Sequence, residues 1–332
     1  MTNERNITMK IRSITLIIAL LLILSCLVGC SDLKTDKTDT FTLKVGTLKG
    51  PTGMGMAKVI SDTNASSDSK YEFELFGAPE DITAKLISGN LDIAAVPVNL
   101  AAIINKRTNG EYIIAAINTL GVLHIVENGN TVNNINDLEG KTLHATGQAS
   151  TPEYMLNYIL EQNSLIDKVT IVWHTEHSEL ATLVAAGEVS LAMLPEPHVT
   201  SAIMKNSSLN VAIDLTAEWD KVSEGDAVQG CVIVSKKAIA KNKAIVDEFL
   251  NEYKTSVDYV NNNIVEASEI IANLGIVGAA KAAEKAIPRC NIVFIEGESM
   301  ISSLNEFYNV LYTANPASIG GTLPDDSLYY KK

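Results

Sequence analysis

The chain has 332 residues, 46% of them hydrophobic, and a formal net charge of −13 at pH 7. This length exceeds one typical compact domain and the composition is that of a globular protein, so two lobes are expected. The acidic balance argues against nucleic-acid binding and against adhesion to anionic lipid through a basic face.

The N-terminal residues have the pattern of a secretory signal. A basic stretch at residues 9–12 precedes an almost unbroken apolar run at residues 14–28, and Leu27-Val28-Gly29-Cys30 follows. Small residues at the end of an apolar core mark signal cleavage. We expect a signal peptide over residues 1–29, with an uncleaved signal anchor as the alternative. Residues 30–40 are polar and aperiodic, which predicts a flexible tether.

The sequence then repeats itself. Residues 43–118 align without a gap on residues 141–216, 98 positions further on, and Gly89 falls on Gly187. A period of this length indicates two similar small domains rather than a solenoid. Small ligands bind preferentially between domains, so the repeat predicts a binding cleft.

Each copy shows strand and helix patterns in alternation. The first copy predicts strands at residues 42–48, 71–76, 91–96 and 112–117, and helices at 53–61, 81–88 and 98–105. The second predicts strands at residues 141–146, 169–174, 189–194 and 211–215, and helices at 152–162, 179–186 and 198–205. Continuous apolar strands alternating with helices favour parallel sheets covered on both faces.

The repeat loses register in a polar, acidic loop at residues 217–227. We expect the chain to cross between the lobes at residues 119–128 and 216–230. Lobe I would then comprise residues 41–124 and 230–332, and lobe II residues 125–229. Apolar spacing of three and four predicts further helices that cover lobe I. These helices span residues 237–262, 264–273, 278–286 and 298–312, with a strand at 292–295 and a turn-rich tail at 320–326.

The repeat also pairs the loops in which a ligand could bind. In open parallel sheets, ligands bind beyond the carboxyl ends of the strands. Two such loops open helices, and free N–H groups there, with Ser or Thr hydroxyls, can hold an oxyanion or carboxylate. Ordinary helix capping is the alternative. The candidates from this first pair are Lys49, Gly50, Thr52, Gly53, Gln148, Ser150 and Thr151.

The second pair of loops follows Pro97 and Pro195. Asn99, Glu196 and His198 are the candidate ligand contacts there, against the alternative that each is a surface cap. Glu176 and His177, after another strand, could also reach a ligand.

No catalytic residues, metal site or cofactor are expected. The chain lacks a GxSxG motif and any Cys/His spacing typical of a metal site. After residue 30 the only arginines are Arg107 and Arg289, so no arginine clamp is expected from the candidate loops, where Lys49 is the only cation. Cys231 and Cys290 lie in apolar contexts, which favours buried free thiols over the disulfide that an exported protein could form.

Several segments resemble a known family. Leu27-Val28-Gly29-Cys30 is similar to the lipobox of bacterial lipoproteins, and the duplicated core resembles the solute-binding lipoproteins of ABC importers. Residues 137–142 (DLEGKT), 147–152 (GQASTP) and 194–197 (LPEP) are similar to the nitrate/sulfonate/taurine group, which includes relatives that bind the thiamine pyrimidine precursor. The resemblance covers roughly residues 41–312. It implies an α/β, type II periplasmic-binding-protein fold, with two similar lobes joined by a two-crossing hinge.

The resemblance also implies a function. Cys30 would carry a lipid that anchors the protein to the extracytoplasmic face of the cell membrane. A monomer would capture a sulfonate, a nitrate-like anion or a pyrimidine-type solute for the permease and ATPase subunits of an ABC importer, without catalysis. No family arginine or tryptophan matches the pocket loops, so Glu196 and His198 could instead hydrogen-bond a heteroaromatic ring. The alternatives are an enzyme of menaquinone- or pyrimidine-pathway type on the same fold, and a ligand sensor.

Overall fold

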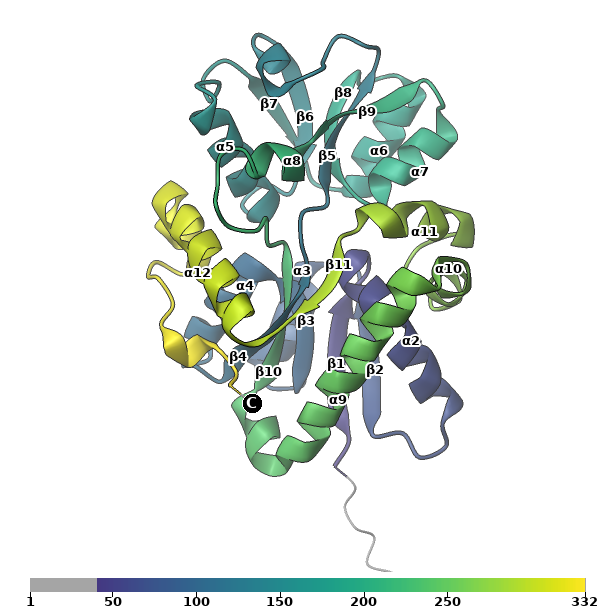
Figure 1. Ribbon diagram of the computed structural model, residues 1–332, viewed down its shortest axis with the longest axis vertical. Helices are drawn as coiled ribbons and strands as arrows, with labels where there is room; N and C mark the ends of the chain where they lie inside the picture. The colour runs from purple at the N-terminus through teal and green to yellow at the C-terminus, as the bar shows by residue number, and fades with distance from the viewer. Residues whose placement is uncertain (1–40, 332) are drawn as a thin grey trace, which may run out of the picture. The chain divides into compact units, whose positions relative to one another are not determined.

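The computed structural model describes residues 41–331, which contain two α/β lobes, each built on one β-sheet (Figure 1). From Phe41 onward the chain forms one compact unit. The expected signal peptide at residues 1–29, the lipidated Cys30 and the tether at residues 30–40 lie outside the described residues.

The sheet of lobe I has the order β11-β4-β10-β3-β1-β2. Its strands are β1 (Leu43–Leu48), β2 (Tyr71–Phe76), β3 (Ile93–Pro97), β4 (Tyr112–Thr119), β10 (Gly230–Ser235) and β11 (Ile292–Ile295). Strand β1 pairs in parallel with β2 and β3, whereas β10 runs antiparallel to β3 and β4.

The sheet of lobe II has the order β7-β6-β8-β5-β9. Its strands are β5 (Leu123–Asn128), β6 (Thr142–Thr146), β7 (Thr170–His174), β8 (Leu191–Pro195) and β9 (Leu209–Asp214). Strand β6 is parallel to β7 and β8, and β5 is antiparallel to β8 and β9. The expectation of parallel sheets was therefore wrong for the strands β5 and β10. Each arrives from the other lobe and inserts at the same place in its sheet, against the direction of its neighbours.

Both faces of the lobe I sheet are covered, as expected. Along β3, Ala94 and Val96 pack into one apolar cluster and Ile93 and Ala95 into another, and all four are buried. Successive side chains of a strand point to opposite faces, so this alternation places an apolar core on each side of the sheet.

A helix follows each strand of the parallel triplets, which confirms the predicted alternation. In lobe I these helices are α2 (Pro51–Ala65), α3 (Pro79–Ile87) and α4 (Val98–Arg107). In lobe II they are α5 (Thr151–Gln162), α6 (His177–Ala186) and α7 (His198–Lys205), and the short 3₁₀ helix η1 (Ile135–Leu138) precedes β6.

The chain crosses between the lobes twice. The first crossing, residues 120–122, joins β4 to β5, so β5 begins slightly before the expected start of lobe II at residue 125. The second follows helix α8 (Leu215–Trp219) and leads into β10. A Cβ on Gly121 would lie 2.8 Å from the Cβ of Thr216 and closer still to its hydroxyl. Glycine at this position therefore lets the two crossings approach each other.

Residues 217–227, which were expected to form a polar, acidic loop, contain a buried tryptophan that packs into the core. Trp219 is fully buried, and its indole N–H donates to the carbonyl of Gly225 at 2.6 Å. Its ring packs against Tyr158 of α5 and Phe307 of α12 (Gly297–Ala314), with a centroid distance of 5.2 Å in each case. The expectation failed because burial of the large Trp219 ring between two helices stabilises the segment even though its neighbours are polar.

The C-terminal part is helical and packs mainly on lobe I, as predicted. Its elements before α12 are α9 (Lys236–Asn262), α10 (Ile264–Asn273), α11 (Ala280–Ala286) and the 3₁₀ turn η2 (Ile287–Arg289). Helix α9 packs along α2 (Figure 1). Helix α11 also contacts α7 of lobe II, and α12 contacts α5 of lobe II. Two further 3₁₀ turns, η3 (Pro316–Ile319) and η4 (Asp326–Leu328), precede a bridge from Tyr329 to Ile114 of β4.

Candidate ligand-binding site between the lobes

The loops at the carboxyl ends of the parallel strands meet where the two lobes join. Asn99 opens α4 in lobe I and Thr151 opens α5 in lobe II, and the Thr151 hydroxyl donates to Asn99 Oδ1 at 3.0 Å. Both residues are at least 95% buried. Two candidates from different copies of the repeat are thus in direct contact, at the edge where parallel sheets bind ligands.

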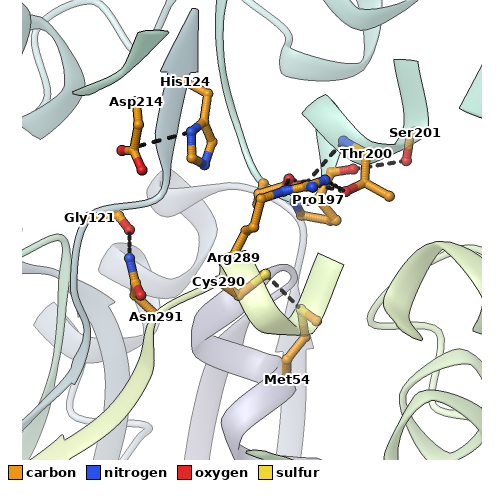
Figure 2. A network of polar contacts seen from close by, with 11 residues as sticks. Met54, Gly121, His124, Pro197, Thr200, Ser201, Asp214, Arg289, Cys290 and Asn291 are labelled. Carbon is orange, nitrogen blue, oxygen red and sulfur yellow. Dashed lines mark hydrogen bonds and ion pairs between the residues drawn. The ribbon is translucent and has the colours of Figure 1, made fainter. Parts of the chain in front are cut away.

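A second contact between the lobes involves Arg289, at the end of η2. Its Nε donates to Glu196 Oε1 at 2.6 Å, and its Nη2 donates to the hydroxyl of Thr200 at 2.6 Å (Figure 2). The Thr200 hydroxyl in turn donates to Glu196 Oε1, and the Thr200 N–H donates to Oε2. The Glu196 side chain is fully buried, whereas Arg289 is 40% exposed. The carboxylate is therefore held by a cation from the other lobe and by the first turn of its own helix α7.

Four polar side chains flank the two crossings, and we call them the hinge polar cluster: Asn118, Thr119, His124 and Thr216. Within residues 41–331 their side-chain nitrogens and oxygens are buried and have no hydrogen-bond partner. Asn118, Thr119 and His124 are 0%, 2% and 4% exposed. A buried donor or acceptor left unpaired costs about 1–3 kcal/mol, and native structures contain few of them.

His124 lies on β5 at the lobe II end of the first crossing. Figure 2 shows its ring directed from β5 toward the segment that carries Arg289 and Cys290. Its Nδ1 is 3.8 Å from Asp214 Oδ1, too far for a hydrogen bond. Burial lowers the pKa of His124, Asp214 and Glu196 oppose that shift, and Arg289 adds to it. The imidazole is therefore neutral at pH 7.

Asn118 and Thr119 lie at the lobe I end of the same crossing. A Cβ on Gly230 would lie 2.6 Å from Asn118 Oδ1 and 3.0 Å from Thr52 Cγ2. The side chains of Asn118 and Thr52 therefore both lie close to Gly230, near the start of α2. Tyr253 of α9 lies beside Asn118. Burial raises the pKa of this tyrosine and the nearby amide opposes the shift, yet no hydrogen bond of good geometry joins the two side chains.

The candidates of the first loop pair do not act as ordinary caps. Gly50, with φ of 97°, begins α2, and the Thr52 hydroxyl donates back to the carbonyl of Leu48 at 3.2 Å. Ser150 donates to the carbonyl of Gly147 at 2.7 Å. Neither α2 nor α5 has a side-chain cap in the described structure, so the capping alternative was wrong for Thr52 and Ser150. The first-turn N–H groups of both helices stay free of capping side chains.

The remaining candidates divide between core and surface. Gly53 is buried, and a Cβ there would lie 2.6 Å from the carbonyl oxygen of Leu48, so α2 can start this close to β1 only with glycine. Lys49 and Gln148 are exposed. His198 packs against His177 with a ring distance of 5.4 Å, and burial lowers its pKa while Glu196 opposes that shift.

A groove of about 750 Å³ lies elsewhere, between α2 and α9. Two of its acids already form ion pairs, Asp62 with Lys58 and Glu248 with Lys70, each at 2.5 Å. These are exposed pairs of the kind that contributes little energy. We therefore place the candidate site between the lobes and not in this groove.

Among the described residues, no group of three or more His, Cys, Asp or Glu side chains is arranged to hold a metal ion. No described helix combines the length and the apolar character needed to cross a bilayer. Cys231 and Cys290 are buried free thiols, which confirms the favoured expectation.

The sequence also matches a protein family. Residues 77–267, more than half of the chain, fit the family model described as NMT1/THI5 like. The chain belongs to the NMT1/THI5-like family. No curated protein matches it in sequence.

Solved structures show the fold of this NMT1/THI5-like protein. An ABC transporter protein from Parabacteroides distasonis is 24% identical, with a TM-score of 0.74 over 88% of this chain and 99% of that one. The periplasmic aliphatic sulphonate binding protein SsuA from Escherichia coli is 14% identical, with a TM-score of 0.68 over 88% and 94%. The desulfurization enzyme DSZB is 12% identical, with a TM-score of 0.59 over 82% and 92%. The type II periplasmic-binding-protein fold is thereby confirmed.

Sequence reasoning missed the hinge polar cluster and Arg289 in this NMT1/THI5-like chain. A signal was present for both. Asn118 and Thr119 end an otherwise apolar strand, and His124 interrupts another. Arg289 is one of only two arginines after residue 30, and it reaches the site from η2 rather than from a loop of the repeat.

Proposed function

We propose that this protein is the solute-binding component of an ABC importer. It captures a small solute between its two lobes and delivers it, as a monomer, to permease and ATPase subunits. The observation that carries this proposal is the convergence of polar side chains from both lobes on the hinge. Asn99 meets Thr151, Arg289 meets Glu196, and the unpaired hinge polar cluster lies beside the two crossings.

The fold supports a cycle of opening and closing. Within residues 41–331 two crossings link the two sheets, and the first is as short as residues 120–122. Hinge closure around a ligand is the motion that such an arrangement allows.

The site supports binding better than catalysis. DSZB shows that an enzyme can have a similar fold. Here, however, the thiols of Cys231 and Cys290 are buried, and burial raises the pKa of each, so neither is an activated nucleophile. His124 has no hydroxyl or thiol partner within hydrogen-bond distance in the described chain, as a general base would require.

The solute is a sulfonate, a nitrate-like anion or a pyrimidine-type molecule. The first turns of α2 and α5 have no side-chain cap, which supports an acceptor group on the ligand, since N–H groups at helix N-termini favour oxygen acceptors. The sulphonate binding proteins of similar fold make sulfonates a natural first choice for testing.

The sequence pattern of residues 9–30 supports export and anchoring as part of this proposal. Residues 1–29 are removed as a signal peptide, and Cys30 carries the lipid that holds the protein on the extracytoplasmic face of the cell membrane. Metabolic labelling with radioactive palmitate tests this. The wild type should be labelled and Cys30→Ala should not, and label retained in the variant would contradict the anchor.

The binding role is tested by thermal unfolding of residues 41–332 with a solute panel. The panel contains taurine, nitrate, 4-aminopyrimidine and amino acids. A ligand that binds only the folded state raises the melting temperature by mass action, by an amount that grows with its concentration. At least one compound should do so, and calorimetry should show one site per chain. A flat response to the whole panel, together with turnover of any of its members, would refute the proposal.

A further inference from the structure

The groove of about 750 Å³ between α2 and α9, which we call the flank groove, is acidic (Figure 1). Side chains from residues 58–71 and 244–256 of lobe I line it. They include five carboxylates and two lysines, so the net formal charge of the groove is −3. Thr63 and Ser66, at the C-terminal end of α2, also line the groove, and the last turn of this helix contains no basic residue. A helix C-terminus carries a partial negative charge, which adds to the acidic field.

The lysines of the flank groove do not neutralise all of its acids. Each lysine already pairs with one carboxylate at 2.5 Å. A third acid, Asp247, pairs at 2.6 Å with Lys243, which lies outside the groove. Within residues 41–331 the other two acids, Asp68 and Glu252, form no ion pair, and both are exposed. A ligand in the groove would therefore meet two carboxylates that have no cation of their own.

A buried tyrosine hydroxyl at the flank groove also lacks a partner. Tyr71, the first residue of β2, lines the groove and is 6% exposed. Its ring packs edge-on against Phe249 of the core, with a centroid distance of 5.3 Å. Among the described residues its hydroxyl has no hydrogen-bond partner. Burial, followed by the charge of the neighbouring Glu252, raises the pKa of Tyr71, so the phenol stays protonated at neutral pH and can both donate and accept.

A structural role does not explain this hydroxyl. A buried hydroxyl without a partner costs folding free energy, and phenylalanine would fill the same place without that cost. Strand β2 accepts phenylalanine on this face, because Phe73 lies two residues further on and packs against the same core. The hydroxyl of Tyr71 and the carboxylate of Glu252 together suit a ligand group that is a cation and an N–H donor.

The groove selects among cations. A metal ion is not favoured, because no group of three or more His, Cys, Asp or Glu side chains in the described chain is arranged to hold one. A quaternary ammonium ion binds aromatic faces, but the Tyr71 ring packs against Phe249. An ammonium group with N–H donors matches the hydroxyl and the carboxylates, and the volume of the groove is in the range of small-molecule sites.

We propose that the flank groove is a second binding site, separate from the one between the lobes, for a small aliphatic polyamine such as a diamine. Rotation of the exposed Glu252 side chain uncovers the Tyr71 hydroxyl. One ammonium group then donates to both residues, and the other lies in the field of Asp68 and the C-terminal end of α2. This site uses residues of lobe I only, so it does not depend on the proposed function.

The test is isothermal titration of the full-length chain in detergent with 1,4-diaminobutane at pH 7 and constant ionic strength. Butane-1,4-diol, tetramethylammonium and Mg²⁺ are the comparison probes. Tyr71→Phe and Glu252→Gln each remove one group of the site. Tyr253→Phe is the control for the first, because its hydroxyl is also buried and unpaired but lies outside the groove. Glu269→Gln, at an exposed position of α10, is the control for the loss of one negative charge.

We expect the wild type to bind 1,4-diaminobutane and none of the three comparison probes with similar affinity. Tyr71→Phe and Glu252→Gln should each weaken that binding by roughly fivefold or more, as for loss of a hydrogen bond to a charged group. The ligand-free melting temperature of Tyr71→Phe should stay equal or rise, since the variant removes an unpaired buried group. Tyr253→Phe and Glu269→Gln should bind the diamine like the wild type.

Three results would overturn the proposal. One is the absence of diamine binding to the wild type. Another is an equal loss of affinity in Glu252→Gln and Glu269→Gln, which would show only a general attraction of cations to an acidic chain. The third is binding of tetramethylammonium or Mg²⁺ as tight as that of the diamine, which would show that the groove does not recognise N–H donors.

Discussion

Arg289 and Glu196 form an ion pair across the two lobes, with Nε and Oε1 2.6 Å apart. The carboxylate is fully buried and the guanidinium is partly exposed, so the pair lies at the edge of the interface between the lobes. Ninety-three positions separate the two residues in the sequence. The contact holds η2 of the C-terminal region against the start of α7, and the proposed opening of the lobes requires that this contact separates.

Replacing Arg289 by methionine should destabilise the ligand-free protein. The change keeps the apolar stem but leaves Glu196 as a buried carboxylate without its cation. Breaking a buried pair in this way costs about 3–5 kcal/mol, and the partial exposure of Arg289 reduces our expectation to about 1–3 kcal/mol. Urea unfolding at pH 7 measures the difference. Lys281→Met, which breaks an exposed pair with Glu284, is the control and should cost under about 0.5 kcal/mol. Equal losses in the two variants would show that the contact between the lobes contributes no more than a surface pair.

Acidification should destabilise the protein through partly buried histidines, His177 above all. Burial, followed by the neighbouring His198, lowers the pKa of His177 to about 4 from an ordinary value of 6.5. Between these two pKa values the unfolded chain binds a proton at His177 and the folded chain does not. The free energy of unfolding therefore falls as the pH drops from about 6.5 toward 4. The effect is on the order of a few kcal/mol at the lower end. Unfolding midpoints in urea at pH 7, 6 and 5 provide the measurement.

His177→Asn provides the comparison for the pH effect. Asparagine keeps a polar atom near the hydroxyl of Thr146, which His177 Nδ1 contacts at 2.6 Å, but it does not titrate. The variant should lose less stability than the wild type between pH 7 and pH 5. Identical slopes would show that other groups cause the acid sensitivity.

Thr52→Ala and Ser150→Ala should weaken ligand binding much more than they lower stability. Their hydroxyls donate to the carbonyls of Leu48 and Gly147 rather than cap α2 and α5, so we expect stability losses of only about 0.5 kcal/mol. Binding of the solute found in the panel should fall at least fivefold. Ser235→Ala is the control, because Ser235 caps α9 through the N–H of Ala238 and should cost about 1 kcal/mol without changing affinity. Parallel losses of binding and stability would mean that the two hydroxyls are structural.

Gly121→Ala should disturb the crossings. Its new Cβ would lie 2.8 Å from the Cβ of Thr216, so the two segments must separate, at an expected cost of about 1–3 kcal/mol. Thr216→Ala in the same chain removes the hydroxyl oxygen, which is the nearest atom, and the methyl group but keeps the Cβ, so it should recover part of the loss. Gly278→Ala, where a Cβ would meet nothing within 4 Å, is the control for glycine replacement and should be close to neutral. If Gly121→Ala is as stable as this control, a Cβ at residue 121 fits between the two crossings without displacing them.

Much of the architecture could be predicted from consecutive residues. The apolar runs that became β2 and β11 and the periodic stretches that became α7 and α10 have the predicted bounds. These patterns depend on the spacing of neighbours along the chain, so they survive without knowledge of the fold. The direction of each strand within its sheet, in contrast, could not be predicted from consecutive residues. Strands β5 and β10 are antiparallel to β8 and β3 because the chain enters each of them from the other lobe. The local sequence pattern does not predict from which lobe a strand is entered.

Consecutive residues alone establish that this chain is duplicated, that each copy alternates strands and helices, and which loops end the parallel strands. Which side chains meet at those loops depends on the packing of the whole molecule. Asn99 and Thr151 are 52 positions apart, and Arg289 comes from outside the repeat altogether. Periodicity is a property of short segments, whereas an ion pair or an unpaired buried amide depends on how two lobes pack against each other.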